Sequence, residues 1–189
     1  MSFLPYLAGC LFTLAGLGAA VVTGTVLSSR LLPGWTGPVS WLATALLATA
    51  TAIGTSLALG TFGLFTAWSW LLLTVIVAAS IWHWQDRLPV AGARPDIVSV
   101  SASRGLTMVG TAIAVGAFGA FTAGIAERLG TGMTGFDSTW YHGPFAAGIA
   151  QSGDTWSLHF LAPQFLSWFY PQNSEVIHAI GMAGFGNDL

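Results

Sequence analysis

The side chains that could carry chemistry concentrate in the last third of this 189-residue chain, which holds three of its four histidines. Asp137 follows a glycine-rich stretch, and its carboxylate can cap a short helix running to about residue 151 or accept a proton. On such a helix Asp137, Trp140 and Tyr141 stand at i, i+3 and i+4. One helix face is therefore expected to present a carboxylate beside two amphipathic aromatic rings.

The histidines do not predict a metal site. His142, His159 and His178 are too far apart in the sequence for zinc-ligand spacing, and the single cysteine, Cys10, has no partner within the chain. Glu175 and His178 form one E-x-x-H, whereas a di-iron bundle needs two such helices. We therefore expect these histidines at the surface or the membrane interface.

Composition places the chain in a membrane. Only 6% of the residues are charged and 54% are hydrophobic, against roughly 25% charged in a soluble domain. Five basic and seven acidic residues give a net charge of -2, which provides no electrostatic attraction to nucleic acid. The expected partner is the lipid bilayer, and nucleic acid is excluded.

The hydrophobic pattern predicts an all-α membrane protein with about four transmembrane helices in residues 1–126. The apolar runs fall near residues 3–28, 39–59, 62–83 and 105–126, and each can cross a hydrocarbon core about 30 Å thick. Gly60 and Gly63 mark a tight turn between the second and third runs. The tryptophans near the ends of these runs are expected at the membrane interfaces; they are Trp35, Trp41, Trp68, Trp70, Trp82 and Trp84.

Arginine placement predicts the orientation in the cell membrane. Most of the arginines lie in the first turn or in the linker 84–104, so the positive-inside rule makes both connections cytoplasmic. Arg128 is the exception. The N-terminus and residues 127–171 are then extracytoplasmic, and the latter form an amphipathic juxtamembrane loop. Asn173 to Glu175 are typical of a helix start, so residues 172–189 are expected to open a fifth span that is cut short, as in a fragment of a longer protein.

The loop sequence FDSTWYHGPFAAGIAQSGD, with the later WFYPQNSE, resembles the first extracytoplasmic loop of GT-C type membrane glycosyltransferases. The likeness is to bacterial members that use polyprenyl-phosphate-linked sugars, and the hairpin LALGTFGLFTAWSWLLL is also similar; together it covers roughly residues 40–182. The resemblance implies that Asp137 is a catalytic general base. It also matches Tyr141 and His142, and the later run Asn173 to Glu175, to family positions.

Transfer of a sugar from a lipid phosphate needs a base for the acceptor hydroxyl and a cation or hydrogen-bond donors for the departing phosphate. The candidate substrate-binding residues that the resemblance implies are Trp140, Tyr141, His142, His159, Tyr170, Asn173 and Glu175. A divalent metal ion is the one cofactor that this chemistry leaves open. Family enzymes have many more spans, so the implied activity requires a longer chain or a companion membrane chain.

Other functions stay open. The chain fits a non-catalytic membrane subunit or an inactive truncated fragment. A small transporter is less favoured, because ionisable residues are found only at the ends of the predicted spans. Without a catalytic role for Asp137, the aromatic residues form an interfacial belt. From its position alone, Glu175 is expected to complement the dipole of its helix.

Overall fold

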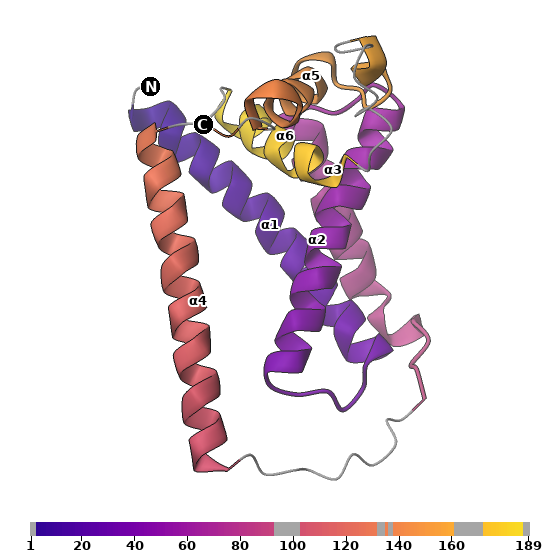
Figure 1. Cartoon of the computed structure of the whole chain (residues 1–189). Helices are drawn as coiled ribbons and strands as arrows, with labels where there is room; N and C mark the ends of the chain where they lie inside the picture. The colour runs from indigo at the N-terminus through magenta and orange to yellow at the C-terminus, as the bar shows by residue number, and fades with distance from the viewer. Residues whose placement is uncertain (1–2, 93–102, 132–134, 136–137, 161–171, 187–189) are drawn as a thin grey trace.

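The computed structural model describes residues 3–92, 103–131, 135, 138–160 and 172–186, and every regular element within these ranges is helical (Figure 1). The elements, in chain order, are α1 (Phe3–Leu31), α2 (Pro38–Thr61), α3 (Ala67–His83), η1 (Gln85–Arg87), α4 (Arg104–Thr131), η2 (Ser138–His142), α5 (Gly143–Ser152), η3 (Ser157–Phe160) and α6 (Asn173–Phe185). The predicted all-α fold class is thus confirmed.

Three helices are long and apolar enough to cross a membrane: α1, α2 and α4. The third predicted run yields α3, which has 17 residues and a length of about 26 Å. It starts at residue 67 instead of 62 because Thr66 and Ser69 form a capping box. The chain is therefore a membrane protein by the criterion of its helices, and the count of four spans stays a prediction.

The helices α1, α2 and α3 pack against one another as a bundle. Gly24 of α1 approaches α2 so closely that a Cβ at this position would lie 2.5 Å from the carbonyl oxygen of Thr44. Hydroxyl pairs link the helices: Ser28 to Thr44 at 3.0 Å and Thr55 to Thr74 at 3.2 Å. Small residues and interhelical hydroxyl bonds are typical of helix packing in membranes.

Trp70 corrects one prediction. It is 1% exposed instead of lying at a membrane interface, and its Nε1–H donates to the carbonyl of Ala52 at 3.4 Å. Its ring fits beside Gly16 of α1, where the absent side chain leaves room. By contrast Trp41, Trp68, Trp82 and Trp84 are exposed on the outside of the bundle.

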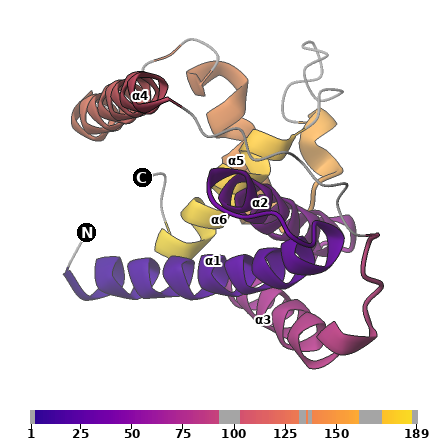
Figure 2. The same ribbon diagram turned by 90° about the horizontal axis from the view of Figure 1, so that it is seen from below.

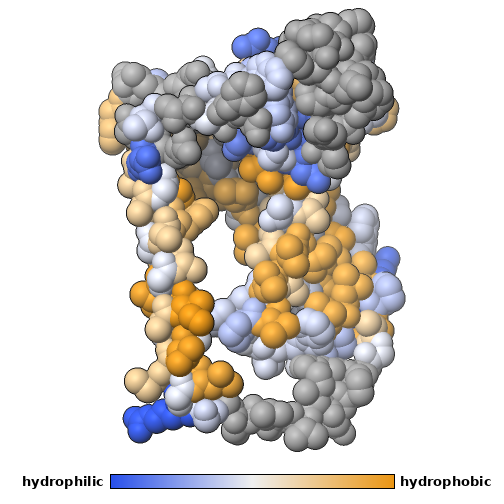
Figure 3. Space-filling model, in the orientation of Figure 1, coloured by the Kyte–Doolittle hydropathy of each residue, from blue (hydrophilic) through white to orange (hydrophobic). Residues whose placement is uncertain are grey.

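Helix α4 stands apart from the bundle (Figures 1 and 2). None of the span from Arg104 to Glu127 is buried, although the helix is apolar along its length. Hydrophobic residues cover the middle of α4 and much of the visible face of the bundle (Figure 3). Such a surface needs lipid or another apolar partner around it.

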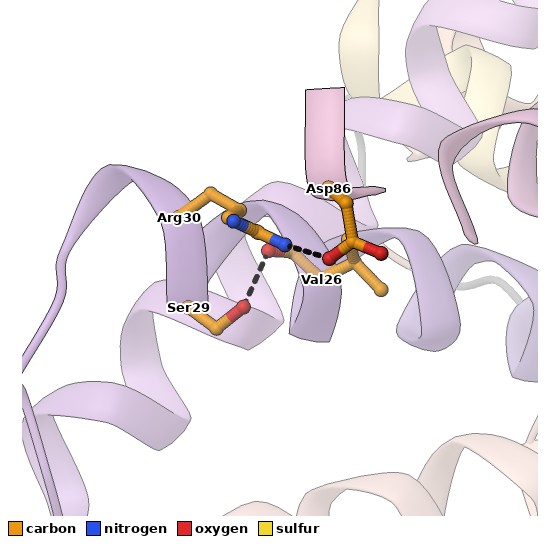
Figure 4. A network of polar contacts seen from close by, with 4 residues as sticks. All are labelled: Val26, Ser29, Arg30 and Asp86. Atoms are coloured by element: carbon orange, nitrogen blue, oxygen red, sulfur yellow. Dashed lines mark hydrogen bonds and ion pairs between the residues drawn. The ribbon is translucent and has the colours of Figure 1, made fainter. Parts of the chain in front are cut away.

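An ion pair joins the end of α1, before the connection to α2, to the start of the predicted cytoplasmic linker (Figure 4). A guanidinium nitrogen of Arg30 lies 2.7 Å from Oδ1 of Asp86, and the backbone N–H of Ala91 donates to the carbonyl of Arg30 at 3.0 Å. Both connections therefore lie at the same end of the bundle, as a shared side of the membrane requires.

Candidate carboxylate–imidazole site

The candidate site lies at the opposite end of the bundle, where α5 and α6 pack against each other and α6 also contacts α1 and α2 (Figure 1). The two short helices share an apolar core in which Phe145, Ala146 and Ile149 of α5 and Val176 and Ala179 of α6 are fully buried. This core fixes the backbone on which the polar residues of the site are mounted.

The approach to α5 is unusual in its backbone. The helix expected from residue 137 to about residue 151 divides into a π-helical turn, Ser138–His142, and the regular helix α5, which has Pro144 in its first turn. A proline there costs no intrahelical hydrogen bond. Short π-helical segments occur frequently at functional sites, so the turn that carries Trp140, Tyr141 and His142 is a reasonable place for chemistry.

His142 and Glu175 form the central contact. Nδ1 of His142 bonds to Oε1 of Glu175, while Oε2 of Glu175 accepts a hydrogen bond from the hydroxyl of Ser174 at 2.9 Å. The Glu175 side chain is 2% exposed and that of His142 is 30% exposed. A buried carboxylate is costly unless it is paired and hydrogen-bonded, and here both oxygens have partners.

The ring of Tyr141 packs beside this pair. Its centroid lies 4.0 Å from that of the His142 ring and 6.1 Å from that of Phe145. The tyrosine thus connects the histidine to the apolar core of α5. The imidazole is consequently held on two sides, by a carboxylate and by an aromatic ring.

The predicted site residues divide into three groups. His142 and Glu175 are brought together from positions 33 residues apart, with Tyr141 beside them, whereas Trp140 and Asn173 are exposed. Asp137 and Tyr170 lie outside the described residues, as does the side chain of His159, whose backbone belongs to η3.

The E-x-x-H does not act as a unit. His178 is exposed on α6, and the partner of Glu175 is His142 instead. Glu175 does lie in the first turn of α6, as expected. Within the described ranges, no three His, Cys, Asp or Glu residues lie close enough to hold a metal ion.

The turn that follows α5 is held by the side chain of Asp154. The carboxylate of Asp154 accepts from the backbone N–H of Trp156 at 3.1 Å and from both the N–H and the hydroxyl of Ser157 at 2.7 and 2.6 Å. Burial alone would raise the pKa of Asp154, but these hydrogen bonds outweigh it and hold the pKa below its ordinary value.

This turn docks onto the connection between α2 and α3. The N–H of Phe65 donates to the carbonyl of Gly153 at 2.9 Å, and the N–H of Thr155 donates to the carbonyl of Gly60 at 3.2 Å. These two hydrogen bonds join backbone groups, so no side-chain pattern in the sequence predicts them. The docking fixes the far end of α5 to the bundle.

A cleft of about 510 Å³ lies between α1 and α2 near Arg30. Serine and threonine hydroxyls, Trp35 and Trp41 line it, and no ionisable side chain does. Several of the hydroxyls already bond to their own helices, as those of Thr25 and Ser29 do. The cleft therefore offers no acid–base chemistry, and the candidate site remains the pair at the other end.

No protein-family model, curated protein or solved structure matches this chain.

Proposed function

We propose that this chain belongs to a membrane glycosyltransferase that moves a sugar from a polyprenyl-phosphate donor to an acceptor on the extracytoplasmic side. The observation that carries the proposal is the His142–Glu175 pair. Two sequence segments that the GT-C resemblance matches separately, around Tyr141 and around Glu175, meet in one site, as parts of a single active site should.

In the proposed reaction Asp137 is the general base. Its carboxylate takes the proton of the acceptor hydroxyl, whose oxygen forms a bond to the anomeric carbon of the sugar. The bond from that carbon to the phosphate oxygen breaks, and its electron pair leaves with the polyprenyl phosphate. Trp140 and Tyr141 offer rings for stacking on the sugar.

The proposed orientation places the site at headgroup depth. The N-terminus and residues 127–171 are extracytoplasmic, and the Arg30–Asp86 end is cytoplasmic. The site lies at the opposite end of the bundle from that ion pair. A polyprenyl carrier keeps its phosphate at the membrane surface, so donor and site meet without the phosphate entering the hydrocarbon core.

A second candidate function is a non-catalytic subunit of a larger membrane complex. The observation that favours it is the apolar helix α4, of which no part from Arg104 to Glu127 is buried against the rest of the described chain. A companion membrane chain would cover it through close helix packing. The same partner could complete the enzyme under the first proposal.

Sugar transfer by membranes containing the protein, with a panel of polyprenyl-phosphate sugars as donors, tests the enzymatic function. Asp137→Asn keeps helix-capping ability, because Asn caps about as well as Asp, and is expected to reduce turnover about 10²-fold or more at equal expression. Asp86→Asn is the control, since Asp86 lies at the other end and is 91% exposed. Undiminished transfer by Asp137→Asn would remove the base assignment, whereas no sugar transfer that depends on the wild-type chain would favour the subunit.

A further inference from the structure

We propose that His142, oriented by Glu175, binds the phosphate of the lipid carrier through its Nε2, and that Glu175 is a positioning residue instead of a substrate ligand. The identity of the lipid rests on the proposed function. The anion-binding role of the imidazole rests on the geometry of the pair.

Glu175 is unsuited to contact a substrate. Its side chain is 2% exposed, and its oxygens are engaged by His142 and by the hydroxyl of Ser174. A second anion brought to a buried carboxylate would also be repelled. The carboxylate therefore acts on the imidazole and not on the ligand.

The contact at Nδ1 decides what the rest of the ring can do. An ionised carboxylate only accepts hydrogen bonds, so Nδ1 carries the proton in this pair. Nε2 makes no hydrogen bond within the described part of the chain, and the His142 side chain is 30% exposed. When the ring is protonated, Nε2–H donates to an anion while Glu175 balances the charge of the imidazolium.

Few described side chains at this end of the bundle can carry a positive charge, and His142 is one of them. The chain has no lysine. Among the described side chains, Arg30 and Arg87 lie at the opposite end of the bundle, and Arg104 begins α4 far from α5 and α6 (Figure 1). The imidazoles of His142 and His178 are then the described groups near α6 that can carry a positive charge.

Helix α6 also directs its N-terminal end toward the pair, because Glu175 lies in its first turn. The positive end of a helix dipole favours negative charge nearby. As the sugar leaves, the phosphate oxygen gains the electron pair of the broken bond, and the hydrogen bond from Nε2–H strengthens with that charge. No proton has to be transferred.

Binding to the whole chain in phosphatidylcholine nanodiscs tests the proposal, with polyprenyl phosphate, the uncharged polyprenol and inorganic phosphate as separate probes. His142→Gln and Glu175→Gln should each weaken polyprenyl phosphate binding about 10-fold or more, the loss expected for a charge-assisted hydrogen bond. The double variant should lose no more affinity for polyprenyl phosphate than the single variant that binds it less tightly, because the two residues act as one unit.

His178→Gln is the matched control, since His178 is an exposed imidazole on α6, the helix that carries Glu175. This variant should keep wild-type binding. Unchanged binding by His142→Gln would overturn the proposal. Equal binding of polyprenol would overturn phosphate recognition, and equally tight binding of inorganic phosphate would overturn the lipid as its source.

A spectroscopic measurement separates positioning from mere folding. In ¹⁵N-histidine-labelled protein, which has four histidines, long-range ¹H–¹⁵N correlations report which ring nitrogen carries the proton. We expect the Nδ1–H form for neutral His142. Glu175→Leu, which removes the hydrogen-bond acceptor, should change the ring signals of His142 and of no other histidine. If His142 kept its Nδ1–H signal in Glu175→Leu, the positioning role would be wrong.

The binding measurement also separates this proposal from the proposed function. Histidine-dependent phosphate binding without any sugar transfer would sustain the anion site and discard the glycosyltransferase. Sugar transfer with an unchanged KM in His142→Gln would discard the anion site and keep the enzyme.

Discussion

Gly16 of α1 faces the ring of Trp70 in α3 so closely that a Cβ on residue 16 would lie 2.2 Å from the ring atom Cζ3. The indole is buried and bonded through Nε1 to the backbone of α2. Because the rigid ring has no room to retreat, this contact fixes the separation of α1 and α3.

Gly16→Ala should therefore destabilise the bundle by about 1–3 kcal/mol, the usual cost of overpacking. Gly18→Ala is the matched control, because a Cβ there meets nothing within 4 Å, and it should be neutral or slightly stabilising. Thermal unfolding in one detergent, followed by tryptophan fluorescence, compares the two variants. Equal melting temperatures would show that α1 and α3 do not pack as described.

Gly153 has a φ of 76°, and a Cβ there would lie 3.1 Å from the carbonyl oxygen of Phe65. Gly153→Ala combines left-handed strain of about 1–2 kcal/mol with this close contact, so it should loosen the docked turn. Gly34→Ala isolates the strain, since Gly34 has a φ of 81° and no neighbour within 4 Å of a Cβ.

Limited proteolysis after residue 153 measures the loosening. Cleavage should be faster in Gly153→Ala than in wild type and unchanged in Gly34→Ala. Similar cleavage in both glycine variants would attribute the effect to general instability instead of lost docking.

Asp154 predicts a pH dependence of stability. Its pKa is lowered in the folded chain, so its stabilising contribution is present above the unfolded value of about 3.9 and is lost as the pH falls through the lower folded pKa. Asp154→Asn should lower the melting temperature at pH 6, and the difference from wild type should shrink below about pH 4. A difference that stays constant down to pH 2 would contradict this.

Thiol labelling tests the proposed sides of the membrane. In a Cys10→Ser background, cysteine at exposed Trp156 should react with a membrane-impermeant maleimide in intact cells, and cysteine at exposed Asp86 should react only after permeabilisation. Labelling at position 86 but not at position 156 in intact cells would invert the orientation.

The long apolar runs and the glycines between them made much of the fold predictable. The long helices end within a few residues of the apolar runs, and the turn falls at Gly60 and Gly63 as expected. The start of α3 was missed although its signal, Thr66 and Ser69 three residues apart, was present. Trp70 was wrongly expected at an interface because its burial depends on Gly16 in another helix. The sequence around Trp70 does not reveal that contact.

The site was only half predictable. The resemblance named His142 and Glu175 as separate candidates, but their pairing depends on how α5 and α6 pack, and the nearer histidine, His178, was the more obvious partner. Helical periodicity could have helped, because Glu175 shares the face of α6 that carries Val176 and Ala179, all of them buried. A carboxylate on an apolar face requires a cation or donors opposite it.

The docking of Gly153 and Thr155 onto the turn between α2 and α3 sets an order for biogenesis. The N–H of Phe65 and the carbonyl of Gly60 are synthesised early, yet their partners follow α4 in the chain. Under the proposed orientation, the translocon must deliver α4 across the bilayer before these groups can pair. A nascent chain stalled before that crossing would lack both hydrogen bonds between the two turns, so the connection between α2 and α3 would be held by the bundle alone.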